Sequence, residues 1–394
     1  LTYIFSFYQY LNATEPPDNA VRLRDTFAAF YHDPTEEREG IPAYYATELE
    51  VVFNALADMD WPDHGWVNEA PGVGLCVSDT LMYQRGDPDA SDPHLSSIYG
   101  MAMPLVKHGL PLQIVQLEAL ARPGYLDGLE ILLLSYDGQK PPSADVHTAL
   151  AGWVEQGGVL IVFGDGDLYN AVRSWWTDKY SSPQAHLFEL LGVKDETVTA
   201  HGRGQVMVVA QTPTELAYDP QGAQRVREVV RQAIGRISRT WNETNTLILK
   251  RGPYVIAAGM EETDLDAEGR VLDGKYVNLF DADLMVVRDP LIIPGSQWLL
   301  YDLSYAAPAP AWVVAASGRI YDERVETGGI SFTIKAAQGT TAVVSVLLPA
   351  KPSRVEMQSL NRMIERWDEE TRLLFLSFPA QNTGTLVSIH YDVH

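Results

Sequence analysis

The residues best suited to ligand recognition gather in the first 70 positions of the chain. They combine aromatic rings with side-chain amides at the end of one apolar segment and in a later tryptophan pair: Tyr8, Gln9, Tyr10, Asn12, Trp61 and Trp66. Aromatic rings pack against the C–H faces of sugars, and amides hydrogen-bond to sugar hydroxyls, so this set predicts a carbohydrate-binding surface. The alternative for each ring is packing in a hydrophobic core, and the sequence alone leaves it open.

Cleavage of a glycosidic bond requires two carboxyl groups, about 5–5.5 Å or about 6.5–9.5 Å apart. Glu15 supplies one carboxylate near the end of the first aromatic segment. No second carboxylate can be named as its partner, so the catalytic residues stay unassigned. We expect them on polypeptide upstream of Leu1.

A second group of polar residues follows the apolar runs of residues 72–165. If these runs are parallel strands, one edge of the sheet carries Ser78, Asp79, Glu118, Tyr136, Asp137, Asp165 and Asp167. Carboxylates at one edge could hold a hard cation through oxygen ligands. An Asp after a strand more often caps the next turn, so we predict neither a metal nor a cofactor.

Other site chemistries have little support. Gly72 and Gly74 precede or begin the first run instead of following it, which is the wrong place for a dinucleotide fingerprint. No G-x-S-x-G elbow or Walker A sequence occurs, and Cys76 lies inside a strand, where a packing role is expected. The nine histidines are scattered without a metal-binding spacing; those at 32, 64, 94 and 108 are expected on the surface or in loops.

Composition narrows the class of partner. The net charge of -23 argues against nucleic acid and anionic lipid, since phosphate binding needs clustered cations. It suits a neutral sugar, although solubility is the better explanation of the charge. With one cysteine there is no intrachain disulfide, so redox chemistry does not reveal the compartment. No apolar run approaches the roughly 20 residues of a transmembrane helix.

Residues 1–70 predict an incomplete unit. Leu1–Tyr10 is aromatic and β-branched, as in a buried strand. Pro42 opens a helix whose apolar positions fall at three- and four-residue spacing: Tyr45, Leu49, Val52, Phe53 and Leu56. One strand and one helix cannot bury this much apolar surface, so we expect the pair to be the last β-α unit of a barrel. The chain opens at Leu1, without Met or a signal-peptide pattern, which suggests that upstream polypeptide was removed or that the sequence is a fragment.

Strands and helices alternate over the next hundred residues. Apolar runs at 73–77, 112–117, 131–136 and 159–163 predict strands, and helices are expected between them from Ser96 or Ser97 and from Ser143. This alternation predicts a parallel sheet. Short helices are expected at 169–176 and 185–191 and a longer one at 223–237.

The spacing of apolar residues changes to two after residue 240. Runs at 246–250, 254–258, 298–301, 330–334, 342–348 and 373–378 predict an antiparallel sheet or sandwich. The fold class is therefore α/β plus all-β, with the domains 1–70, 71–240 and 241–394.

Three stretches resemble a known family: GVGLCVSD, SSIYGMAMPLVKHGLPLQIVQ and YLDGLEILLLSYDGQKPPSADVHTALAGWVEQGGVLIVFGDGD. In style and order they are similar to the β-galactosidases built from a TIM barrel, a glutamine-amidotransferase-like trimerisation domain and a small C-terminal β domain. The resemblance covers about the first 165 residues. It implies a flavodoxin- or amidotransferase-like α/β domain, and it makes residues 1–60 the eighth β-α unit of the barrel.

The same resemblance implies a β-linked sugar substrate, a companion N-terminal polypeptide and a homo-oligomer, a trimer by analogy. The family's catalytic glutamates lie on barrel strands absent from this sequence, so no catalytic residue carries over. The chain departs from the family in a larger C-terminal β region and in residues 166–240. Cys76 is misplaced for amidotransferase activity.

Three hypotheses follow. The favoured one is the C-terminal part of a glycoside hydrolase with a two-carboxylate mechanism, in which residues 8–12 border a sugar pocket. The second is a non-catalytic carbohydrate-binding or oligomerisation module, with an exposed aromatic platform around Trp298, Trp312 or Trp367. The third, an amidotransferase- or protease-like hydrolase, would need Cys76 for activity.

Overall fold

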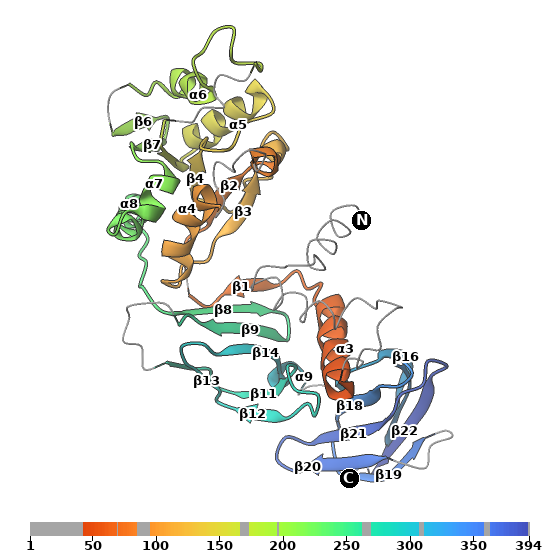
Figure 1. Ribbon diagram of the computed structural model, residues 1–394. Helices are drawn as coiled ribbons and strands as arrows, with labels where there is room; N and C mark the ends of the chain where they lie inside the picture. The colour runs from red at the N-terminus through yellow and green to blue at the C-terminus, as the bar shows by residue number, and fades with distance from the viewer. Residues whose placement is uncertain are drawn as a thin grey trace, which may run out of the picture.

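The computed structural model describes residues 42–68, 70–84, 95–165, 173–194, 197–261, 269–306, 311–357 and 363–392. They form a parallel α/β body, a middle antiparallel sheet and a C-terminal β-sandwich (Figure 1). The mixed class predicted from the sequence, α/β plus all-β, is confirmed. In this part of the chain no helix is both long and apolar enough to cross a bilayer.

The α/β body is built on a six-stranded sheet. Its order is β3 (Gln113–Gln116), β2 (Val73–Val77), β4 (Ile131–Ser135), β5 (Val159–Phe163), β7 (Gly204–Val209) and β6 (Val198–His201). All neighbours are parallel except β6, which pairs antiparallel with β7. The strands predicted at the positions of β2 to β5 are confirmed.

Helices cover both faces of this sheet because alternate residues of the buried strands point to opposite sides. Ile131 and Leu133 pack toward α4 (Ser96–Val106), α7 (Pro213–Tyr218) and α8 (Gly222–Arg236). Leu132 and Leu134 pack toward α5 (Ala144–Glu155) and α6 (Pro183–Leu191). Ser143 caps α5 by accepting the Asp145 N–H, as the sequence suggested.

Residues 166–240 differ from the prediction in part. The helices predicted at 185–191 and 223–237 are present as α6 and α8. The segment also supplies the strands β6 and β7, which were missed. Of the short helix predicted at 169–176, residues 173–176 form a bend and a turn, and residues 169–172 lie outside the described residues.

The middle sheet joins chain segments from both sides of the α/β body. Its order is β1 (His64–Trp66), β8 (Thr246–Arg251), β9 (Tyr254–Gly259), β14 (Gln297–Asp302), β11 (Lys275–Asn278) and β12 (Val286–Arg288). The chain enters the α/β body after β1 and returns in β8, and these two strands pair. A short ribbon of β10 (Arg270–Val271) and β13 (Leu291–Ile292) flanks the sheet.

The sandwich packs two four-stranded antiparallel sheets around Phe332, Val344, Leu376 and Ile389. One sheet contains β15 (Trp312–Ala316), β18 (Thr341–Leu347), β21 (Leu373–Pro379) and β20 (Ile364–Asp368). The other contains β16 (Arg319–Glu326), β17 (Gly329–Lys335), β22 (Thr385–Tyr391) and β19 (Pro352–Met357).

The helix α3 (Ala43–Asp58) lies between the middle sheet and the sandwich, as Figure 1 shows. Val51 and Ala55 share one buried cluster with residues of both β bodies. Glu50 accepts the Ala337 N–H at 3.1 Å and the Thr340 hydroxyl at 3.2 Å, which ties the helix to the loop before β18. The two β bodies and α3 therefore form one packed unit.

The predicted apolar face of α3 is wrong. The helix begins at the expected place, but it buries Thr47, Val51 and Ala55, while Phe53 is 63% exposed and Leu56 is also exposed. The small residues face the sandwich because they let the helix approach β15 and β18 closely. The predicted strand Leu1–Tyr10 lies outside the described residues.

Candidate functional site

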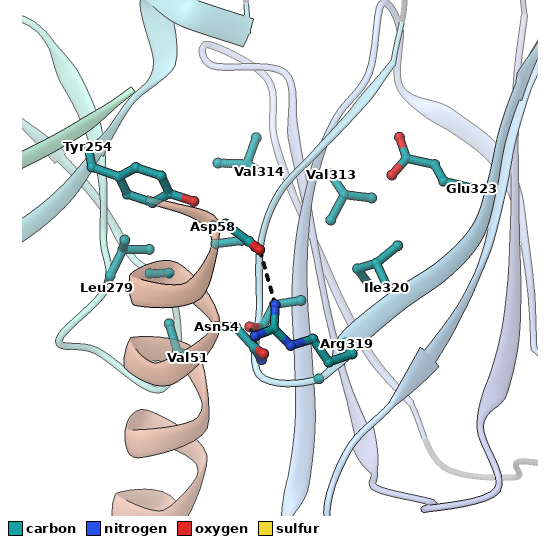
Figure 2. A pocket seen from close by; sticks show the side chains of 14 residues that line it. Val51, Asn54, Asp58, Tyr254, Leu279, Val313, Val314, Arg319, Ile320 and Glu323 are labelled. Carbon is teal, nitrogen blue, oxygen red and sulfur yellow. Dashed lines mark hydrogen bonds and ion pairs between the residues drawn. The ribbon is translucent and has the colours of Figure 1, made fainter. Parts of the chain in front are cut away.

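A pocket of about 190 Å³ lies where the C-terminal end of α3 meets the sandwich. Its polar groups come from three segments that are far apart in the sequence: Asn54, Asp58, Tyr254, Arg319 and Glu323. Apolar side chains complete the wall, and Figure 2 shows both kinds of residue around the hollow. The volume is smaller than the roughly 300–1,000 Å³ of drug-sized pockets, so it suits one small ring-sized ligand.

The helix contributes Asn54 and Asp58, one turn apart and therefore on the same side. The Asn54 amide donates to the Ala316 carbonyl at 3.2 Å, which holds the helix against the end of β15. Asp58 is the last residue of α3, where the helix dipole is unfavourable for a carboxylate. Its charge is met by Arg319, whose Nη1 lies 3.0 Å from Asp58 Oδ1.

A β-bulge in β16 contributes Glu323. Tyr321 pairs with Thr333 and Arg324 with Ser331, so Asp322 and Glu323 together oppose one residue of β17. Asp322 takes a left-handed φ of 52°, which a residue in a regular strand avoids. Bulges of this kind redirect the following side chain, and Glu323 lines the pocket. Desolvation by the surrounding protein raises the pKa of the Glu323 carboxyl.

Tyr254 closes the side of the pocket formed by the middle sheet. Burial, and then the negative charge of Asp58, raises the pKa of its phenol, which therefore stays protonated and able to donate. The ring packs edge-on against Tyr301 at 5.6 Å between centroids. The pocket thus offers carboxylate acceptors, guanidinium and phenol donors, and an apolar wall.

Of the six residues predicted to bind sugar, the structure describes only Trp61 and Trp66. Trp61 follows Asp58 by three residues and is 36% exposed, but it does not line the pocket. Trp66 is exposed in β1, and no contact between it and the pocket is seen. Tyr8, Gln9, Tyr10 and Asn12 lie outside the described residues.

The five polar residues of the pocket were missed from the sequence. They are separated by up to 269 positions, and no local spacing links them. One signal was available, namely an acidic residue at the C-terminal end of a helix, where a cation is normally preferred.

At the carboxyl ends of the parallel strands, the carboxylates accept hydrogen bonds from other protein groups instead of facing an open site. Glu118 accepts the Ser78 hydroxyl at 2.7 Å and the Asp79 N–H at 3.1 Å, and Asp137 accepts the Thr214 hydroxyl at 2.9 Å. Each of these contacts reaches a segment 39 or more positions away and not the turn that follows the strand, so the predicted capping role is not seen for Glu118 and Asp137. Among the described residues, no group of three or more His, Cys, Asp or Glu side chains could hold a metal ion.

Cys76 is fully buried in β2, and burial raises the pKa of its thiol to about 12. A thiol that stays protonated is a poor nucleophile. The predicted packing role of Cys76 is confirmed.

Two histidines of the α/β body make side-chain contacts that the sequence did not suggest. His147 Nε2 lies 2.6 Å from the Tyr136 hydroxyl and its Nδ1 lies 2.7 Å from His186 Nδ1, so three titratable groups form a chain in the α/β body. Burial, with the nearby His186, lowers the pKa of His147 to about 3. His108 lies in the turn after α4, as the prediction of a surface or loop position allows, although it is buried there; His64 is exposed as expected, and His32 and His94 lie outside the described residues.

No family model matches the chain. No curated protein matches it either. Solved structures are similar in part. A β-galactosidase from Bacillus circulans sp. alkalophilus is 10% identical over 59% of this chain and 41% of its own, with a TM-score of 0.37.

Two further structures extend this picture. A GH42 β-galactosidase from G. stearothermophilus is 10% identical over 60% of this chain and 40% of its own, with a TM-score of 0.36. An α-L-fucosidase from Paenibacillus thiaminolyticus is 8% identical over 84% and 50%, with a TM-score of 0.30. The chain spans about two fifths of the length of these β-galactosidases. Likenesses this low support no argument about its activity.

Proposed function

We propose that this chain is the C-terminal part of a glycoside hydrolase that acts on β-linked sugars such as β-galactosides. In this proposal the catalytic glutamates lie on a companion N-terminal polypeptide of the same enzyme, and the α/β body forms a homo-oligomer, a trimer by analogy. The sequence resemblance supports the companion and the trimer. The geometry of the pocket between α3 and the sandwich supports a sugar as the ligand.

The observation that carries the proposal is the pocket between α3 and the sandwich. A sugar hydroxyl both donates and accepts, and it therefore needs acceptors such as Asp58 and Glu323 next to donors such as Arg319. The C–H face of a sugar needs an apolar wall, which Leu279 and Val313 provide. Figure 2 shows these side chains around one hollow.

The alternative is a non-catalytic carbohydrate-binding module that uses the same pocket. One observation bears on it: the Asp58 carboxylate is already engaged by Arg319, so the pocket itself is suited to binding, and any hydrolysis depends on the companion polypeptide. Hydrolysis separates the two functions, because only the first proposal requires it.

The test uses the whole protein that contains this chain. Hydrolysis of a nitrophenyl β-galactoside is followed together with calorimetric binding of galactose and glucose. We expect turnover, and we expect Glu323→Gln or Asn54→Ala to weaken monosaccharide binding about tenfold or more. Glu326→Gln, on the same strand but outside the pocket lining, is the matched control.

Binding without turnover would favour the module. No binding of any monosaccharide at millimolar concentration, or equal binding by all variants, would exclude a sugar site in this pocket.

A further inference from the structure

Exposed aromatic rings lie on the connection from α3 to β1, on α9 and at the start of β15. Trp61 is 36% exposed and Tyr305, in the short helix α9 (Leu303–Ala306), is 46% exposed. The two rings meet edge to face, with centroids 6.1 Å apart and an interplanar angle of 78°. Trp312, at the start of β15, is 41% exposed. We call Trp61, Tyr305 and Trp312 the aromatic platform.

The rings of the platform are held in place by the residues beneath them. Trp61 lies against Gly252, where a Cβ would come within 2.4 Å of the indole, so the turn between β8 and β9 needs glycine there. The Trp312 indole N–H donates to the Tyr301 hydroxyl at 2.9 Å. Rings fixed in this way lose little conformational entropy when a ligand stacks on them.

Two short stretches of chain connect the platform with residues that line the pocket. Asp58 of the pocket precedes Trp61 by three residues, and Tyr254 of the pocket follows Gly252 by two. Tyr254 also contacts Tyr301, which anchors Trp312. The polar pocket and the exposed rings are therefore connected by short chain segments and by the contacts of Tyr301 with Tyr254 and Trp312.

We propose that the platform extends the pocket into a binding site for a β-linked oligosaccharide, with one sugar in the pocket and the next stacked on Trp61. This inference rests on the proposed function and adds the substrate class to it: a chain of sugars instead of a single one. Flat C–H faces of β-linked pyranoses fit aromatic rings, and the hydroxyls between them fit the charged groups nearby.

A protein partner fits this surface less well. The cores of protein interfaces are depleted of charged residues. Here the charges of Asp58 and Arg319 lie near Tyr254, and Asp302 adjoins α9, so charges and rings occur together. That arrangement suits a ligand which is polar and apolar at once.

The test compares galactose with β-linked galactobiose and galactotetraose in calorimetric titrations of the whole protein. We expect the tetraose to bind about tenfold more tightly than galactose. Trp61→Ala should abolish that gain and leave galactose binding unchanged, whereas Trp61→Phe should keep most of it. Tyr218→Ala, which removes a ring that is even more exposed from the α/β body, is the control.

Circular dichroism and the melting temperature establish that each variant folds, and Tyr305→Ala tests the platform if Trp61→Ala does not. Tetraose binding no tighter than galactose binding, or unaffected by Trp61→Ala and Tyr305→Ala, would overturn the inference while pocket variants could still support the proposed function. Failure of every sugar to bind would overturn both. Loss of a co-purifying polypeptide in Trp61→Ala, with tetraose binding intact, would make the platform a protein interface and exclude the inference.

Discussion

Asp58 and Arg319 are 261 positions apart in the sequence, yet their side chains meet at 3.0 Å on the rim of the pocket. Both side chains are about half exposed, so water screens the pair and its contribution to stability is about 0–1 kcal/mol. A carboxylate at the C-terminal end of a helix also opposes the helix dipole. The ion pair therefore contributes little to the stability of the fold. Variants of these two residues can test ligand binding without unfolding the protein.

Arg319→Met should lower the free energy of unfolding by no more than about 1 kcal/mol, as measured by urea denaturation. It should also weaken galactose binding, because the pocket loses its guanidinium donor. Arg354→Met, which breaks the exposed pair with Glu356 on the sandwich, should change stability equally little and leave binding intact. Equal binding by both variants would show that Arg319 does not contact the ligand.

The bulge in β16 yields a prediction about backbone conformation. Asp322 has a φ of 52°, a region that costs a β-branched residue roughly 1–2 kcal/mol and glycine nothing. Asp322→Val should therefore unfold at lower urea concentration than Asp322→Gly, by about that difference in free energy. If both variants unfold alike, the left-handed conformation is not required there.

Some of this architecture was predictable because its signals are local. β5 is an uninterrupted apolar run and β4 is one up to its last residue, Ser135, as expected for strands covered on both faces, and the structure buries every residue in them. β6 and β7 were missed because they are partly exposed and joined by a two-residue turn at Gly202 and Arg203. The alternation of exposed and buried residues over such short strands is a much weaker sequence signal than an apolar run.

Other features depend on tertiary contacts. α3 carries two apolar faces, and its sequence could not indicate that the smaller one, around Val51 and Ala55, would face the sandwich. The pocket needed β16 to reach the end of α3, and the carboxylate of Glu323 needed a bulge to reach the pocket. Periodicity within one segment contains neither kind of information.

Cys76 gives a direct test of the α/β core. Because burial holds the pKa of its thiol near 12, we expect it to resist a thiol reagent at pH 8 in the native protein. In concentrated urea the same reagent should label one thiol per chain, since the sequence contains a single cysteine. Rapid labelling of the native protein would mean that β2 opens readily.

His147 predicts how stability depends on pH. Burial and His186 lower its pKa to about 3, whereas in the unfolded chain the pKa is near 6.5. Between these values the unfolded state binds the extra proton, so the free energy of unfolding falls as the pH falls from about 6.5 to about 3. The loss is on the order of 2–4 kcal/mol if His147 stays buried.

The pH dependence is measured by urea denaturation across this range. His147→Gln keeps a polar partner for Tyr136 and cannot titrate, so its stability should vary less with pH than that of the wild type. His64→Gln removes an exposed histidine and should leave the profile unchanged. A wild-type profile identical to that of His147→Gln would mean that His147 is not held neutral, and the Tyr136–His147–His186 chain would then be open to water.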